Sequence, residues 1–151
     1  MKNMLDQLLQ AIPQEAPFRF VDELTLVDET SAQGSYRFKA DEHFYKGHFP
    51  NHPITPGVIL TETMAQIGLI PLGAFLMIAK GQSEPIDFVL AETKVEFLKP
   101  VYPEDRVFVK SALVYFRFGK LKCKVSMTND QGEELCRGEL SGMVVKRRQD
   151  E

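Results

Sequence analysis

The sequence predicts an α+β fold, in which an antiparallel sheet of about six strands wraps around one long central helix. Residues 58–79 are apolar on almost every face, which is typical of a helix that is buried on most sides. Six other segments have the pattern of strands, and four of them follow this helix. The 151 residues show no internal repeat and no linker, so we expect a single domain, 1–151.

The N-terminal part is expected to hold a short helix and two strands. Apolar residues at positions 4, 5, 8, 9 and 12 follow the helical period, and Pro13 ends this helix. Residues 18–27 have the apolar pattern of a strand. Residues 35–40 alternate between apolar and polar side chains directly after Gly34, which predicts a second strand.

Residues 41–57 are predicted to form a long loop. They contain all three histidines and are rich in proline, which removes backbone donors and restricts the preceding residue. A long loop inside a compact domain often carries function. The buried helix follows at residues 58–79, with Thr55 as a plausible N-cap, Pro56 beside its first turn, and Pro71 expected to kink or split it.

The C-terminal half reads as four consecutive strands separated by short turns. Lys99 and Pro100 close the first of them, and turns near Gly119 and Gly132 separate the last three. The predicted strands are residues 88–97, 107–116, 121–128 and 134–145.

Composition excludes several classes of protein. The net charge of −3 argues against broad nucleic-acid binding. Cys123 and Cys136 are too few for a disulfide framework and lack a zinc-ligand spacing, so we expect buried free thiols and no metal. The N-terminus has no signal-peptide core, and the most apolar stretch, residues 67–79, is too short for a bilayer span. We therefore expect a cytoplasmic protein that binds no membrane.

Glu62 and Gln66 are the polar exceptions in the buried helix. Four residues separate them, so they share one face, one turn apart. A carboxylate among apolar side chains costs several kcal/mol unless it is paired or protonated. Two interpretations stay open: a partly exposed Glu62 that simply bonds to Gln66, or a functional acid in apolar surroundings supplied by Ile59, Met64 and Ile67.

A possible base and a possible oxyanion site precede this acid. His48 lies in the loop, although a single loop histidine is more often an ordinary surface residue. Gly57 and Val58 open the helix, where free backbone N–H groups can stabilise a developing negative charge. An acid, a base and an oxyanion site together suit proton abstraction beside a carbonyl, with loss of a neighbouring group.

Residues 47–58 (GHFPNHPITPGV) and 62–66 (ETMAQ) resemble the active-site signature of the 3-hydroxyacyl-acyl-carrier-protein dehydratases of bacterial fatty-acid synthesis. The resemblance extends to residues 17–22 and 97–105 and implies a hotdog fold. It assigns the catalytic roles to His48 and Glu62, an oxyanion role to Gly57 beside Val58, and a positioning role to Gln66. Phe88 matches a gating tyrosine, and Phe49 and Ile59 are expected along the acyl tunnel.

The resemblance further implies an acyl carrier protein as partner, no cofactor, and a homodimer or a trimer of dimers whose sites lie between subunits. Departures from the family pattern, such as Asn51 for a glycine and residues 14–16 for a His-Arg-Tyr sequence, indicate a specialised member. Two alternatives remain on the same fold: an acyl thioesterase, or a non-catalytic subunit of a heteromeric dehydratase.

Overall fold

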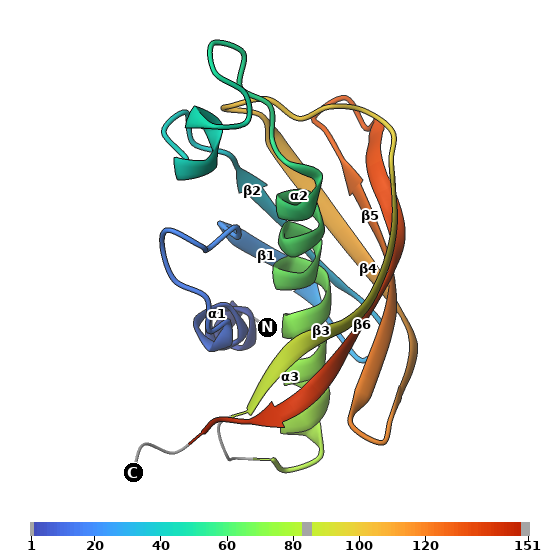
Figure 1. Ribbon diagram of the computed structural model, residues 1–151. Helices are drawn as coiled ribbons and strands as arrows, with labels where there is room; N and C mark the ends of the chain where they lie inside the picture. Colours follow the sequence, from blue (N-terminus) through green and yellow to red (C-terminus); the bar gives the residue numbers. More distant parts are fainter. Residues whose placement is uncertain (1, 83–85, 149–151) are drawn as a thin grey trace.

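The computed structural model describes residues 2–82 and 86–148 and has the predicted architecture, in which a curved sheet wraps around a long helix (Figure 1). Its six strands form one antiparallel sheet in the order β1-β2-β4-β5-β6-β3, as expected of a hotdog fold. The strands are β1 (Glu23–Val27), β2 (Ala32–Arg37), β3 (Ile86–Phe97), β4 (Arg106–Arg117), β5 (Lys120–Thr128) and β6 (Glu134–Lys146). The N-terminal helix α1 (Lys2–Ala11) packs against β1 and the end of the long helix.

The long helix has three parts: α2 (Gly57–Met64), a π-helical turn η2 (Ala65–Leu69) and α3 (Ile70–Ala79). Pro71 does not split it, because the chain stays helical over all 23 residues of Gly57–Ala79. The π turn directly precedes α3, and Pro71 sits in the first turn of α3, where its missing N–H removes no bond that α3 itself needs.

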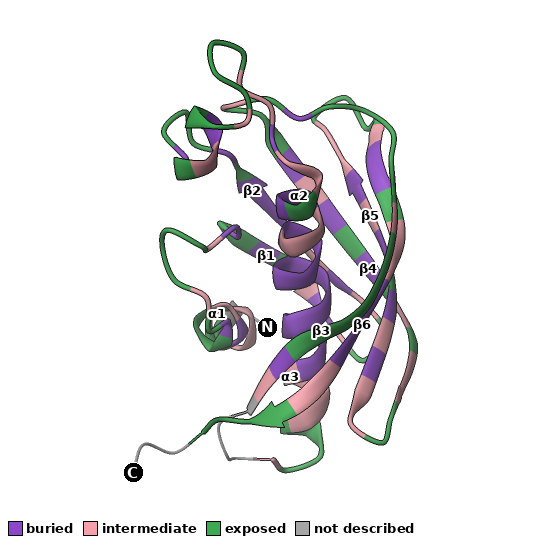
Figure 2. Cartoon of the chain, viewed as in Figure 1, coloured by how far each residue is buried: buried purple, intermediate pink, exposed green. Residues whose placement is uncertain are grey.

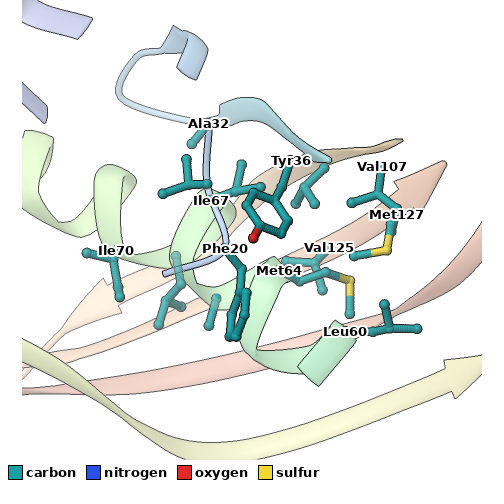
Figure 3. Packing of buried hydrophobic residues seen from close by; sticks show 14 of the residues in the cluster. Phe20, Ala32, Tyr36, Leu60, Met64, Ile67, Ile70, Val107, Val125 and Met127 are labelled. Carbon is teal, nitrogen blue, oxygen red and sulfur yellow. The ribbon is translucent and has the colours of Figure 1, made fainter. Parts of the chain in front are cut away.

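The core lies between this helix and the concave face of the sheet (Figures 2 and 3). Met64 and Ile67 on the helix are fully buried among side chains from the strands, including Tyr36 and Met127. By length and composition the helix could cross a membrane, yet 61% of its most apolar window is buried inside the protein. It is therefore placed as the core helix of a globular fold.

Cys123 and Cys136 are buried free thiols, as predicted. Burial raises the pKa of each thiol to about 12, so both are protonated and unreactive near neutral pH. The Cys136 sulfur packs against the sulfurs of Met64 and Met127, at 3.8 and 3.9 Å. These cysteines act as small apolar core residues.

Two predicted strand boundaries were wrong. The first strand starts at Glu23 and not at residue 18, because the backbone of Phe18 and Phe20 bonds to the Gln66 side chain instead of a neighbouring strand. The second strand spans Ala32–Arg37 and not 35–40. Phe38 leaves the sheet because its backbone bonds to the turn at residues 104–105.

The loop before the long helix contains a 3₁₀ helix, η1 (His43–Lys46), and does not use Thr55 as an N-cap. The Thr55 hydroxyl bonds instead to the Tyr45 hydroxyl at 2.7 Å, and Pro56 precedes the first helical residue. Asn51 has a φ of 70°, a conformation that asparagine tolerates better than most residues. The substitution for a glycine is therefore compatible with this turn.

Candidate active site

Glu62 projects from α2 into a cavity of about 250 Å³ between the long helix, the segment after α1 and strand β3. The cavity walls are mostly apolar: Phe18, Ala65, Leu69, Ile70, Phe88, Val89 and Leu90. Burial raises the pKa of Glu62, and hydrogen bonds from Gln66 and Gln14 partly offset this rise. The sequence suggested other apolar neighbours, but Met64 and Ile67 are buried in the core and do not line this cavity.

Gln66 is fully buried and holds Glu62 in a fixed orientation. Its Oε1 accepts the N–H of Phe20 at 2.7 Å, and its Nε2 donates to the carbonyl of Phe18 at 3.1 Å. These two backbone contacts determine which end of the amide is the donor. The same Nε2 therefore donates to Glu62 Oε2, at 2.9 Å.

His48 lies in the loop beyond the 3₁₀ helix, where its ring is oriented by the backbone. Its Nδ1 is 2.9 Å from the carbonyl oxygen of Ile54, and only a protonated nitrogen can donate there. In the neutral ring Nε2 is then the basic nitrogen. The ring also stacks on Phe49, with centroids 4.2 Å apart, and Phe49 itself is 44% exposed.

Gly57 and Val58 present their backbone N–H groups at the start of the long helix. Among the described residues neither N–H has an acceptor, as expected for a first helical turn. A side chain at position 57 would meet the ring of Phe97, because an ideal Cβ there lies 3.0 Å from its Cζ. The glycine thus lets β3 approach the helix start closely.

The two remaining predicted tunnel residues, Ile59 and Phe88, lie in different parts of the structure. Ile59 belongs to the hydrophobic core, whereas Phe88 lines the Glu62 cavity. Phe88 also lines a second cavity of about 550 Å³, together with Ile70, which is common to both. Its ring packs so closely on α3 that an ideal Cβ at Gly73 would lie 2.5 Å from it.

Within one chain the acid and the base are not brought together. Among the described residues, Glu62 bonds to Gln14 and Gln66, while His48 bonds to Ile54 and is absent from the Glu62 cavity. Gln14 is a site residue that the sequence does not indicate. Residues 14–16 depart from the family pattern, but no periodicity links them to position 62.

The described part of the chain contains no group of three or more His, Cys, Asp or Glu side chains that could hold a metal ion. Another depression, of about 620 Å³, lies on the sheet over β3–β6 and contains neither His48 nor Glu62. The chemistry available is therefore concentrated at the Glu62 cavity and at the loop that carries His48.

Solved structures with the same fold include the dehydratase heterocomplex ApeI:P of Xenorhabdus doucetiae, with a TM-score of 0.77 at 13% identity over 93% of this chain and 91% of that one. A hypothetical thioesterase with coenzyme A from Streptococcus pneumoniae matches with a TM-score of 0.59 at 16% identity, covering 84% and 88%. At these identities the likeness concerns the fold alone.

Sequence comparison is more specific. The chain is 34% identical over 139 residues to the 3-hydroxyacyl-[acyl-carrier-protein] dehydratase FabZ of Caldicellulosiruptor bescii, covering 90% of this chain and 94% of that protein. The FabZ of Bacillus subtilis is 31% identical, covering 91% and 96%. Residues 12–140 match the family described as the FabA-like domain. The chain is therefore a member of the FabA-like domain family, with FabZ-type dehydratases among its relatives.

Proposed function

We propose that this protein removes water from 3-hydroxyacyl thioesters of an acyl carrier protein, giving trans-2-enoyl thioesters, in the cytoplasm and without a cofactor. The observation that carries the proposal is the state of Glu62. It is a carboxyl group in an apolar cavity, with one oxygen held by amides and the other without a hydrogen-bond partner among the described residues. Such a group suits proton donation to a leaving hydroxyl.

Glu62 is the proposed general acid. Burial raises its pKa, which favours the protonated form needed for donation as the pH approaches neutrality. Gln66 can only donate to Oε2, so this oxygen acts as an acceptor, which favours the proton on Oε1. The FabZ-type dehydratases at 31–34% identity support a dehydration, the reaction in which such an acid would act.

His48 is the proposed base, acting through Nε2. It takes the proton from C2 of the substrate, and the electrons of that C–H bond form the C2=C3 double bond. The C3–O bond breaks, the leaving oxygen takes the proton of Glu62, and water departs. The N–H of Gly57, next to that of Val58, donates to the thioester oxygen while negative charge develops there. Afterwards the imidazolium returns its proton, through solvent, to the Glu62 carboxylate.

A second copy of the chain is needed to unite this acid and base. Strand β3 ends the sheet, and most of its side chains that the structure describes, at residues 87–97, are exposed (Figure 2). Val89, Leu90 and Phe97 on this strand are large exposed apolar side chains. A long apolar edge strand pairs readily with another strand. We infer a homodimer joined at β3, in which His48 of one subunit faces Glu62 of the other, and which can assemble further into a trimer of dimers.

The acyl chain is proposed to enter the Glu62 cavity and continue past Phe88. This ring lines both cavities, so its position controls access from the smaller cavity to the larger one. Phe49, stacked on His48 and half-exposed, is proposed at the mouth of the tunnel. Ile59 would support the helix from the core side.

The direct test uses the purified protein with carrier-protein 3-hydroxyacyl thioesters of several chain lengths. We expect loss of water by mass and a new enoyl absorbance. His48→Ala and Glu62→Gln should each lower turnover by at least about 100-fold, the usual scale of acid–base catalysis. Free thiol without an enoyl product would favour the thioesterase. Turnover only after addition of a paralogous subunit would favour the heteromeric role.

Mixed dimers test the shared site. In a dimer of one His48→Ala and one Glu62→Gln subunit, one site has lost both groups and the other retains both. After subunit exchange of an equal mixture we expect about one quarter of the wild-type activity, since half of the dimers are mixed. Sites built within one chain would give no recovery, and that outcome would exclude the inferred dimer.

A further inference from the structure

Glu62 receives two amide N–H groups on the same oxygen. Gln66 Nε2 lies 2.9 Å from Glu62 Oε2, and Gln14 Nε2 lies 3.3 Å from the same atom. Glu62 Oε1 has no protein partner among the described residues, and it is not one of the fully buried atoms. We propose that Gln14 is a positioning residue, whose amide occupies the second lone pair of Oε2 and so confines the transferable proton of Glu62 to Oε1.

The inference rests on the proposed function and on the acceptor capacity of a carboxyl oxygen. Each such oxygen offers about two lone-pair sites in the plane of the group. Gln66 alone would leave one site on Oε2, where a proton could reside facing the protein. With Gln14 in place both sites are filled, and Oε1 is the only oxygen that can carry the proton towards a substrate.

The chain holds Gln14 at this place by a specific device. Pro13 follows α1, and the Arg19 guanidinium donates to the carbonyls of Leu9, Ile12 and Gln14 at 2.9, 3.1 and 2.9 Å. The end of α1 and the backbone of Gln14 are thereby fixed to one cation. The Gln14 side chain reaches Glu62 across 48 positions of sequence.

Stability does not account for this arrangement. The Oε1 atom of Gln14 is buried without a hydrogen bond, and it is the one such buried side-chain oxygen or nitrogen in the described part of the chain. A buried acceptor without a donor is unfavourable, so an apolar side chain of similar length should fit at least as well. A buried acceptor left without a donor calls for an explanation, and a role in the reaction supplies one.

A change in the pKa of Glu62 can be attributed to Gln14 because few other groups near Glu62 titrate. The elements packed around it contribute Gln14, Gln66 and apolar walls, and Glu62 is the only titratable residue that lines the cavity within the described chain. Arg19 is engaged with backbone carbonyls. In the proposed dimer the partner's His48 is the remaining titratable group. Donation by Gln14 favours the ionised carboxylate, so removing it should raise the pKa of Glu62 further.

Gln14→Met removes the amide and keeps the length of the side chain, and Gln7→Met, on the exposed face of α1, is the matched control. We expect kcat of Gln14→Met to fall roughly 3–10-fold because the acid is less well oriented. The alkaline limb of its pH–rate profile should move to higher pH, whereas the profile of Gln7→Met should follow the wild type. The melting temperature of Gln14→Met should be equal to or above that of the wild type.

Infrared titration of the Glu62 carboxyl, identified by difference from Glu62→Gln, measures its protonation without turnover. A higher midpoint in Gln14→Met supports the proposal. An unchanged midpoint together with an unchanged kcat would overturn it, as would a lower melting temperature with an unchanged midpoint, which is a purely structural effect. Gln14→Asn, whose amide is too short to reach, should reproduce the midpoint shift. Failure of the proposed function is distinguished by an inactive wild type or a fully active Glu62→Gln.

Discussion

Replacing Gln66 by leucine should destabilise the protein by about 1–4 kcal/mol. Gln66 has no exposed surface and makes three hydrogen bonds to two separate segments. Without its amide oxygen, the N–H of the fully buried Phe20 loses its acceptor, which costs about 1–3 kcal/mol. The carbonyl of Phe18, a partly exposed residue, can bond to water, so its loss contributes less than about 1 kcal/mol.

The chain contains no tryptophan, so unfolding is best followed by far-ultraviolet circular dichroism. For a domain of this size 1 kcal/mol corresponds to about 2–4 °C, which predicts a melting temperature roughly 2–16 °C lower for Gln66→Leu. Protein concentration must be held constant, because the proposed dimerisation would also shift the transition.

Thr63→Val is the matched control for this experiment. Thr63 is equally buried on the same helix, but its hydroxyl donates only to the Ile59 carbonyl, which needs no second partner. We expect it to cost less than about 1 kcal/mol. A Gln66→Leu variant within about 0.5 kcal/mol of wild type, or a control that is just as costly, would refute the reasoning.

Three further outcomes are expected. Burial raises the folded-state pKa of Glu62 above its ordinary value, so this carboxyl lowers stability as the pH rises from that ordinary value towards the folded one. Glu62→Gln should therefore gain stability relative to wild type as the pH rises above about 4, and a flat difference in melts would contradict this. In Gly73→Ala the new Cβ would lie 2.5 Å from the Phe88 ring and should displace it, which should alter the ranking of acyl chain lengths in the thioester panel. An identical ranking would contradict the proposal that Phe88 controls access to the larger cavity. Val89→Lys puts a charge on the exposed β3 edge and should give inactive monomers by sedimentation, whereas an intact dimer would disprove pairing at β3.

The long helix and the six strands could be predicted because each depends on a strong local pattern. The apolar stretch at residues 58–79 and the alternating segments after it do not require knowledge of distant contacts. The bond between Glu62 and Gln66 is equally local, since a spacing of four places both on one helix face.

Other features could not be predicted because tertiary hydrogen bonds decide them. Phe18 and Phe20 have a strand pattern, yet their backbone pairs with a buried glutamine 46–48 positions away. Thr55 has the chemistry of an N-cap, but Tyr45 takes its hydroxyl. Gln14 carries no periodic signal at all, and its importance follows only from its position beside Glu62.

The candidate acid depends on two opposed effects that come from different parts of the chain. Apolar walls from β3 and the long helix remove water and favour the protonated carboxyl, whereas the amides of Gln14 and Gln66 favour the ionised form. An acid that regains its proton after each turnover needs both: burial alone would hold the proton too firmly, and amides alone would release it too early. Because the cavity opens beside an unpaired strand edge, association at β3 would deepen this burial. We therefore expect dimerisation both to favour the protonated form of Glu62 further and to place the partner's His48 at the site.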